Sequence, residues 1–224
     1  MGNFPHVRIG DDVRAQHKFI TEKFDLKSLA LVVGGSMGAQ QTYEWAVRYP
    51  DMVKRAAPIA GTAKNTIHDS LFTETLVEAI TSDPGFNKGF YASSADVREG
   101  MLRHAKMWAV MGWSTEFFQQ DRHKALGFSS MSDFIVNFMN GYFSVMDPND
   151  LLCMAWKWQR GDVSRHTGGD LRAALGRIKE DLRHAYVFGH VLPAVRLPGR
   201  VAADSRCRVP ADPNHRWPPG AFRC

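Results

Sequence analysis

The beginning of the chain shows apolar positions at the spacing of one helix face. Val13, His17, Ile20 and Phe24 recur every three or four residues, and Asp11 stands just before them. Side chains at this spacing lie on one side of an α-helix, and aspartate is a common capping residue. The pattern predicts a helix that Asp11 caps and whose buried face carries these four side chains.

The pattern then changes to a short, wholly apolar run at residues 29–33. Such a run is typical of a strand buried on both faces of a parallel sheet. After Ser36 the chain regains helical character, and this helix is expected to end just before Pro50 because the residue before a proline disfavours helical backbone. Residues 53–59 have the composition of the next strand. Helices and strands in alternation predict an α/β fold.

Residues 65–160 show helical periodicity with breaks at Gly, Pro and Ser and without a strand pattern. Methionine and aromatic side chains crowd this stretch; most are expected in helix packing, and a minority should line an apolar pocket. We predict a helical lid inserted into the sheet domain, followed by a helix over 170–178. The predicted divisions are a core fragment at 1–64, the lid at 65–160, a return segment at 161–182 and an aberrant, disordered tail at 183–224.

The strongest local signal is a G-x-S-x-G motif formed by Gly34, Ser36 and Gly38. Between a strand and a helix this motif forms a nucleophile elbow, a sharp turn that exposes the serine hydroxyl. Gly34 and Gly38 would let the backbone pass close to a strained serine, and Gly35 belongs to the same turn. We predict Ser36 as the nucleophile and the Met37 N–H as an oxyanion-hole donor. The alternative is a glycine-rich turn that carries a serine by chance.

A serine nucleophile needs a base, and in this kind of fold the chain order is serine, then acid, then histidine. His166 and His184 follow the predicted lid, near Asp162, Asp170 and Asp181. Because their spacing specifies no triad, they are interpreted as polar surface residues.

Other histidines give weaker signals. His68 and Asp69 follow the second strand, where the favoured interpretation is a cap of the first lid helix and the alternative is a position facing the cleft. His17, His104 and His123 have no partner at metal-ligand spacing, so no metal site is predicted.

The chain resembles the homoserine O-acetyltransferase family of α/β-hydrolases. The matching stretches are 4–5, 12–16, 34–38, 44–46 and 170–179. The resemblance implies a partial α/β-hydrolase fold, in which a fragment of parallel sheet carries a large helical lid. It also implies acyl transfer from acetyl-CoA, a co-substrate rather than a bound cofactor, through acyl-Ser36 to homoserine or another hydroxyl acceptor, in methionine biosynthesis. A homodimer of the full-length parent is a further expectation.

One lid segment departs from this family. Its acetyltransferases carry a Tyr-Arg segment that helps hold the amino-acid carboxylate, whereas residues 107–114 contain no arginine. An ester hydrolase of the same family, which passes the acyl group to water, is therefore the alternative.

The composition changes sharply after residue 182. Residues 183–224 hold six of the 11 prolines and no Lys, Glu, Ile, Met, Thr or Gln. The codons of 189–193 and 212–219 can be chosen so that reading one base later gives the family's acid and histidine motifs. We hypothesise a truncated chain with a frameshift shortly after Lys179. A triad without its acid and base loses most of its rate enhancement, so we expect negligible turnover from the truncated chain, and a non-catalytic fragment is a second alternative.

Composition and charge exclude several other classes of protein. The net charge of +5 arises from residues 183–224, and the preceding part carries equal numbers of basic and acidic side chains, so no basic stripe indicates nucleic acid. No apolar run reaches the roughly 18 residues of a membrane helix, and no signal peptide is visible. Three widely spaced cysteines predict neither a disulfide framework nor a zinc site. A cytoplasmic protein with a small-molecule substrate and no nucleic-acid or membrane partner is expected.

Overall fold

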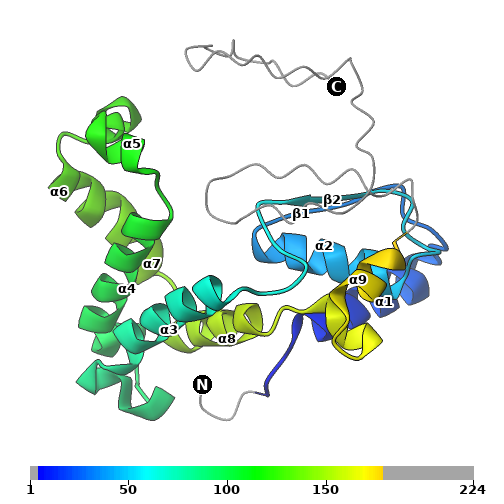
Figure 1. The fold of residues 1–224 in the computed structure, drawn as a ribbon. Helices are drawn as coiled ribbons and strands as arrows, with labels where there is room; N and C mark the ends of the chain where they lie inside the picture. Colours follow the sequence, from blue (N-terminus) through cyan, green and yellow to red (C-terminus); the bar gives the residue numbers. More distant parts are fainter. Residues whose placement is uncertain (1–4, 179–224) are drawn as a thin grey trace. The chain divides into compact units, whose positions relative to one another are not determined.

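Helices dominate residues 5–178, the part of the chain that the computed structural model describes (Figure 1). The elements in chain order are α1 (Ile9–Phe24), β1 (Val32–Gly35), α2 (Met37–Arg48), β2 (Ala56–Ile59), α3 (Ile67–Thr81), η1 (Pro84–Gly89), η2 (Ser94–Val97), α4 (Arg98–Met111), α5 (Thr115–Gln119), η3 (Arg122–Leu126), α6 (Met131–Asp133), η4 (Phe134–Asn140), α7 (Gly141–Ser144), α8 (Pro148–Gln159), η5 (Val163–Thr167) and α9 (Leu171–Gly176). The element η4 is a π-helix and the other η elements are 3-10 helices. The predicted tail at 183–224 and its frameshift hypothesis lie outside the described residues.

The strands β1 and β2 pair in parallel, with Val32 opposite Ala56, and α2 packs against both of them. An isolated bridge between Leu29 and Val53 continues the pairing towards the start of the strands. The predicted α/β fold class is confirmed. The helix after Ser36 ends at Arg48, just before Pro50, as predicted.

The prediction of a strand buried on both faces is wrong for the described residues. Leu31 and Val33 are 52% and 57% exposed, and Ile59 at the end of β2 is 40% exposed. Val32, in contrast, packs against the cluster that contains Trp45 and Val47 of α2. Within the described part of the chain the sheet has two strands. Its second face therefore presents apolar side chains.

The first helix begins earlier than predicted. Arg8 is its N-cap residue, and Asp11 stands three residues into the first turn, where its carboxylate accepts a hydrogen bond from the Arg8 N–H at 2.9 Å. Val13 is buried, as predicted, but Phe24 at the last helical position is exposed. The ring of Phe24 packs edge-on against Phe19 of the same helix. The end of α1 therefore extends beyond the apolar cluster with α2 that buries Val13 near its beginning.

The helices from α3 to α8 pack around one apolar cluster, which confirms the predicted helical character of this segment. Figure 1 shows α3 beside both α4 and α8. Most of the methionine and aromatic side chains serve this packing, and the fully or nearly buried ones include Met101, Phe117, Phe134, Met139 and Phe143. The boundaries of the lid stay a prediction.

The cap of the first lid helix includes Asp69, as predicted, but its N-cap residue is Thr66, and His68 is not part of the capping box. The Thr66 hydroxyl oxygen accepts a hydrogen bond from the Asp69 N–H at 3.1 Å, and the Asp69 carboxylate accepts one from the Thr66 N–H at 3.4 Å. This reciprocal pair is a capping box, which satisfies N–H groups that a helix start leaves without partners.

Two short segments join the lid to the core, and we call residues 63–65 and 161–163 the neck. The Asn65 N–H donates to the Gly161 carbonyl at 2.7 Å, and the Val163 N–H donates to the Ala63 carbonyl at 3.0 Å. A Lys64–Asp162 ion pair at 3.3 Å spans the same two segments. The entry and exit of the lid are therefore held together by backbone and side-chain contacts.

A second connection lies at α8, where Lys157 reaches Asp12 of α1 at 2.8 Å. Both side chains are about four-fifths buried, at 18% and 20% exposure. Removing one partner from such a pair leaves a poorly solvated charge, which is strongly unfavourable. The pair therefore fixes how α8 sits on α1.

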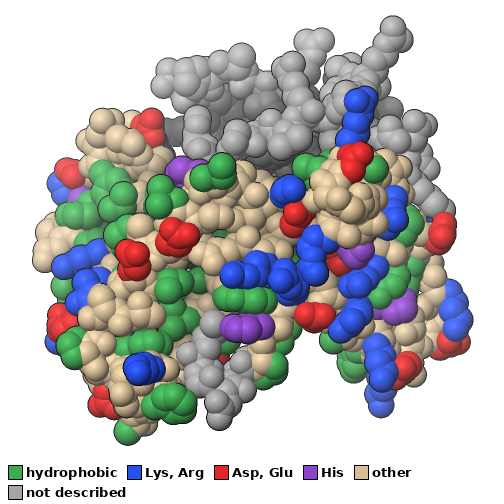
Figure 2. All heavy atoms as spheres, turned by 60° about the horizontal axis from the view of Figure 1, so that its bottom comes forward, with side chains coloured by type: hydrophobic (Ala, Val, Ile, Leu, Met, Phe, Trp, Pro, Cys, Tyr) green, Lys and Arg blue, Asp and Glu red, His purple; other side chains and the backbone are tan. Residues whose placement is uncertain are grey.

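On the face drawn in Figure 2, basic and acidic side chains are interspersed, with hydrophobic side chains exposed among them. None of the helices in residues 5–178 combines the length and apolarity that crossing a membrane requires. The cytoplasmic location stays a prediction.

His104 is a buried structural residue that orients Trp108. Its Nδ1 lies 3.2 Å from the Leu76 carbonyl, and its Nε2 lies 3.1 Å from the Trp108 indole nitrogen. Because an indole N–H can only donate, Nε2 must accept and Nδ1 must carry the proton. The ring is therefore neutral, and its burial lowers the pKa of His104.

Because the pKa of His104 is lowered in the folded chain, the free energy of unfolding should depend on pH. The unfolded chain binds a proton on this histidine near its ordinary pKa of about 6.5, whereas the folded chain does so only at lower pH. The stabilising effect is complete above pH 6.5 and is lost as the pH falls below it. We expect the His104→Gln variant to lose less stability than the wild type between pH 7.5 and 5.5, measured by urea unfolding. An equal loss in both proteins would contradict this assignment.

The exposed sheet face predicts self-association. Val33→Thr keeps the branched shape that suits a strand while making the face more polar. We expect a smaller associated fraction in size-exclusion chromatography with light scattering. The control is Val110→Thr in α4, where the valine is 71% exposed but lies away from the sheet. If both variants reduce association equally, the sheet face is not the cause.

Candidate active site

Ser36 stands at the single position that separates the end of β1 from the start of α2. Its backbone has φ 54° and ψ −119°, and it serves as the N-cap residue of the helix. A positive φ is unfavourable for a residue with a side chain, by about 1–3 kcal/mol, and persists where the surroundings enforce it. Here the Ser36 N–H donates to the Ile59 carbonyl at 2.9 Å, and the Ser36 carbonyl accepts from the Ala39 N–H at 2.9 Å.

Two glycines make this turn sterically possible. A Cβ atom on Gly34 would stand 2.3 Å from the Gly38 carbonyl oxygen, and one on Gly61 would stand 2.4 Å from the Ser36 carbonyl oxygen. Neither position can hold a side chain without moving backbone. A Cβ on Gly35 or Gly38 would meet nothing within 4 Å. Of the three glycines predicted for the elbow, only Gly34 is therefore required by close contact, and Gly38 contributes its backbone.

Met37 opens α2, so its N–H belongs to the first turn of the helix. The first N–H groups of a helix have no intrahelical acceptor, and the helix dipole adds partial positive charge there. A developing oxyanion beside Ser36 would be stabilised by such a donor. The oxyanion role of Met37 and the nucleophilic role of Ser36 remain predictions.

Within residues 5–178, no histidine or carboxylate hydrogen-bonds to the Ser36 hydroxyl. Asp162 and Asp170 instead cap η5 and α9, where they accept hydrogen bonds from the Ser164 and Ala173 N–H groups. His184 and Asp181, also considered from the sequence, lie outside the described residues.

The interpretation of His166 as a polar surface residue is wrong. Its Nε2 lies 2.9 Å from a carboxylate oxygen of Glu44, whose side chain is only 7% exposed. Arg48 contacts the same oxygen at 3.1 Å. These contacts join η5 to α2, so His166 helps hold the return segment against the nucleophile helix.

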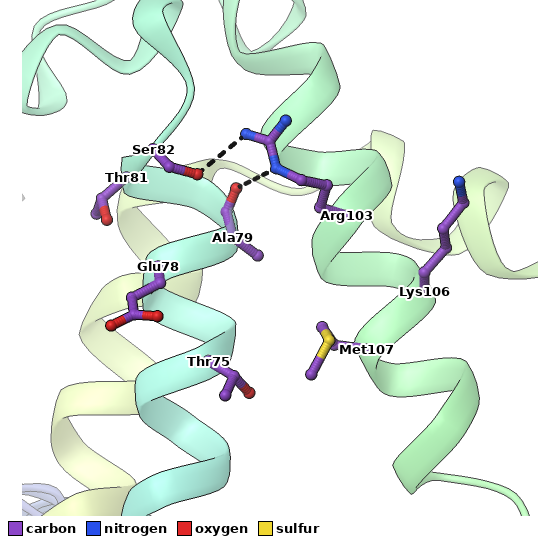
Figure 3. Close-up of a pocket in the computed structure, with 8 residues that line it drawn as sticks. All are labelled: Thr75, Glu78, Ala79, Thr81, Ser82, Arg103, Lys106 and Met107. Atoms are coloured by element: carbon purple, nitrogen blue, oxygen red, sulfur yellow. Dashed lines mark hydrogen bonds between the residues drawn. The ribbon is translucent and has the colours of Figure 1, made fainter.

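A shallow pocket lies between α3 and α4, as Figure 3 shows. Its lining residues are Thr75, Glu78, Ala79, Thr81, Ser82, Arg103, Lys106 and Met107. Arg103 donates to the Ala79 carbonyl and to the Ser82 hydroxyl, both at 3.2 Å. The expected apolar pocket of lid aromatics is therefore not this one. Residues 5–178 also contain no group of three or more His, Cys, Asp or Glu side chains arranged to hold a metal ion.

Several residues beside the elbow gave no functional signal in the sequence. Ala60 has a positive φ of 49°, and Gly61 follows it. Gln40 and Thr62 are 3% and 9% exposed, and their side-chain polar atoms find no hydrogen-bond partner within the described part of the chain. In the sequence, Gly61 stood out only as part of a predicted turn. The surroundings of Ala60, Gln40 and Thr62 depend on segments that are far apart in sequence, so no local pattern indicates them.

Known proteins resemble this chain over most of the described residues. A family model described as alpha/beta hydrolase fold matches residues 7–148. An ethyl acetate hydrolase of Pseudomonas veronii is 71% identical over 176 residues, which cover 79% of this chain and 50% of that protein. The crystal structure of an acetylester hydrolase from Corynebacterium glutamicum shares 57% identity with a TM-score of 0.79, covering 82% of this chain and 52% of that one. The chain thus spans about half the length of these relatives.

These relatives correct the expected reaction. A homoserine O-acetyltransferase from Solidesulfovibrio magneticus is 44% identical over 98 residues, which cover 44% of this chain and 24% of that protein. The esterases are more similar over a longer part of the chain. The prediction of an acyltransferase is therefore wrong, and the alternative of an ester hydrolase has the better support. Acetyl-CoA and homoserine as substrates belonged to the overturned interpretation and have no test here.

The elbow geometry predicts unequal effects of alanine at two motif glycines. Gly34→Ala forces a backbone clash and is expected to lower the free energy of unfolding by about 3 kcal/mol or more. Gly38→Ala meets open space in a helix and should change it by no more than about 1 kcal/mol. Chemical denaturation of both variants checks this. Similar losses in the two variants would contradict the packing described here.

Proposed function

Because this chain belongs to the α/β-hydrolase family, we propose that it hydrolyses acetate esters of small alcohols, with Ser36 as the nucleophile. The observation that carries the proposal is the strained backbone of Ser36, held between a strand end and a helix start. The similarity to an ethyl acetate hydrolase supports the ester as substrate. The similarity to an acetylester hydrolase supports acetate as the acyl group.

The reaction proceeds in two steps through an acyl-serine. The Ser36 Oγ attacks the ester carbonyl carbon while its proton passes to a base, and the Met37 N–H donates to the resulting oxyanion. The tetrahedral intermediate then expels the alcohol, which takes a proton. Water attacks the acetyl-serine in the same way, releasing acetate and restoring the serine. Among residues 5–178, Asp162 and Asp170 cap helices and His166 contacts Glu44, so the base and its orienting acid are left unassigned.

Substrate and nucleophile can be tested together on the full chain. Hydrolysis of ethyl acetate is measured by acid release, and acylation is measured by the burst of nitrophenol from p-nitrophenyl acetate. Ser36→Ala should reduce both by at least about 1,000-fold, because loss of a triad serine removes most of the rate enhancement. Ser144→Ala, at an exposed lid serine, is the matched control and should leave both rates unchanged.

Three outcomes decide the proposal. Turnover that depends on Ser36 supports it. A Ser36-dependent burst without turnover identifies the chain as an acyl-accepting fragment and contradicts hydrolysis by this chain. Equal rates in the wild type and Ser36→Ala contradict the role of the serine.

A further inference from the structure

Gln40 lies one helical turn beyond Ser36, inside the junction between α2 and the neck. Gln40 stands in the first turn of α2, and Ser36 is the N-cap residue of that same helix. Its side chain is 97% buried, at 3% exposure. A long polar side chain is seldom buried to this degree unless its polar atoms are satisfied.

The side chain of Gln40 packs directly against Gly161 of the neck. A Cβ atom on Gly161 would come within 2.5 Å of the Gln40 amide carbon and nitrogen. Gly161 also accepts the hydrogen bond from the Asn65 N–H that closes the neck. The amide of Gln40 is therefore placed where lid entry, lid exit and nucleophile helix meet.

A second buried polar group, Thr62, directly precedes the neck in the chain. Thr62 is 91% buried, at 9% exposure. Its chain neighbour Gly61 touches Ser36 and Ala39, and Ala39 is the chain neighbour of Gln40. Both polar atoms of the Gln40 amide and the Thr62 hydroxyl lack a partner among residues 5–178. Three polar atoms without partners at one junction are unfavourable unless a small polar molecule satisfies them.

We propose that Gln40 and Thr62 form a buried water-binding site, and that through it Gln40 acts as a positioning residue for Ser36. Water is the ligand that fits, because it accepts from the amide N–H and donates to the amide oxygen or the hydroxyl. It would link the first turn of α2 to the loop after β2, the two segments that hold Ser36 in its strained conformation. The positioning role rests on the proposed function, whereas the water site does not.

The water site is tested by a double-mutant cycle on stability. Gln40→Met and Thr62→Val keep size and remove the polar atoms. If both bind one water, each single variant leaves the other group unsatisfied, and each should lower the melting temperature by about 3 °C. The double variant should then lose no more than the larger single loss. Additive losses, or a higher melting temperature in Gln40→Met, would overturn the site.

The positioning role is tested by the rate at which a fluorophosphonate probe labels Ser36. We expect Gln40→Met to lower the limiting rate constant about tenfold and to leave the half-saturating probe concentration unchanged. Gln41→Met is the matched control, because Gln41 on the same helix contacts Gln16 and Asp12 of α1 instead of the neck. Equal limiting rates in wild type and Gln40→Met would refute the positioning role. A wild type without Ser36 labelling contradicts the proposed function, and the stability cycle still decides the water site.

Discussion

The close approach of Gly34 to Gly38 is the constraint from which the rest of the site follows. A Cβ atom added to Gly34 would stand 2.3 Å from the Gly38 carbonyl oxygen, so the end of the strand and the first helical turn can approach each other only without side chains between them. The chain therefore reverses direction at one residue, and Ser36 takes a positive φ to close the turn. Gly61 closes the other side against the Ser36 carbonyl. Packing on two sides enforces a conformation that the serine would not adopt alone.

The strained turn is useful only if the elements around it do not move. Three polar contacts supply this restraint at different places: Asp12–Lys157 between α1 and α8, Glu44–His166 between α2 and η5, and Lys64–Asp162 across the neck. Such pairs add little net stability, because desolvation offsets much of their attraction. What they define is geometry, since each contact joins two elements at one pair of side chains. The lid therefore joins the core through specific contacts rather than through a free hinge.

Local patterns in the sequence predicted those features that depend on neighbouring residues. The elbow motif, the end of α2 before Pro50 and the part of Asp69 in the cap of α3 each involve a few consecutive positions. The Glu44–His166 contact joins residues 122 positions apart, and no local pattern signals it. The same holds for Gln40, whose burial depends on Gly161 across the neck. The wholly apolar run at residues 29–33 also predicted a strand buried on both faces. This prediction failed because apolar composition does not show which faces other elements cover.

The choice between water and an amino alcohol as acyl acceptor depends on the lid, because relatives of both kinds share the elbow region. Holding an amino-acid carboxylate requires a cation, ideally an arginine with its paired donors. In residues 107–114 the corresponding place is used for packing instead. Trp108 turns inward, donates to His104 at 3.1 Å and stacks on Trp158 with ring centroids 6.0 Å apart. These neighbours are neutral, and the cations just before this segment, Arg103 and Lys106, line the pocket between α3 and α4. Neutral packing around Trp108 agrees with the uncharged ester proposed as substrate, which needs no cation.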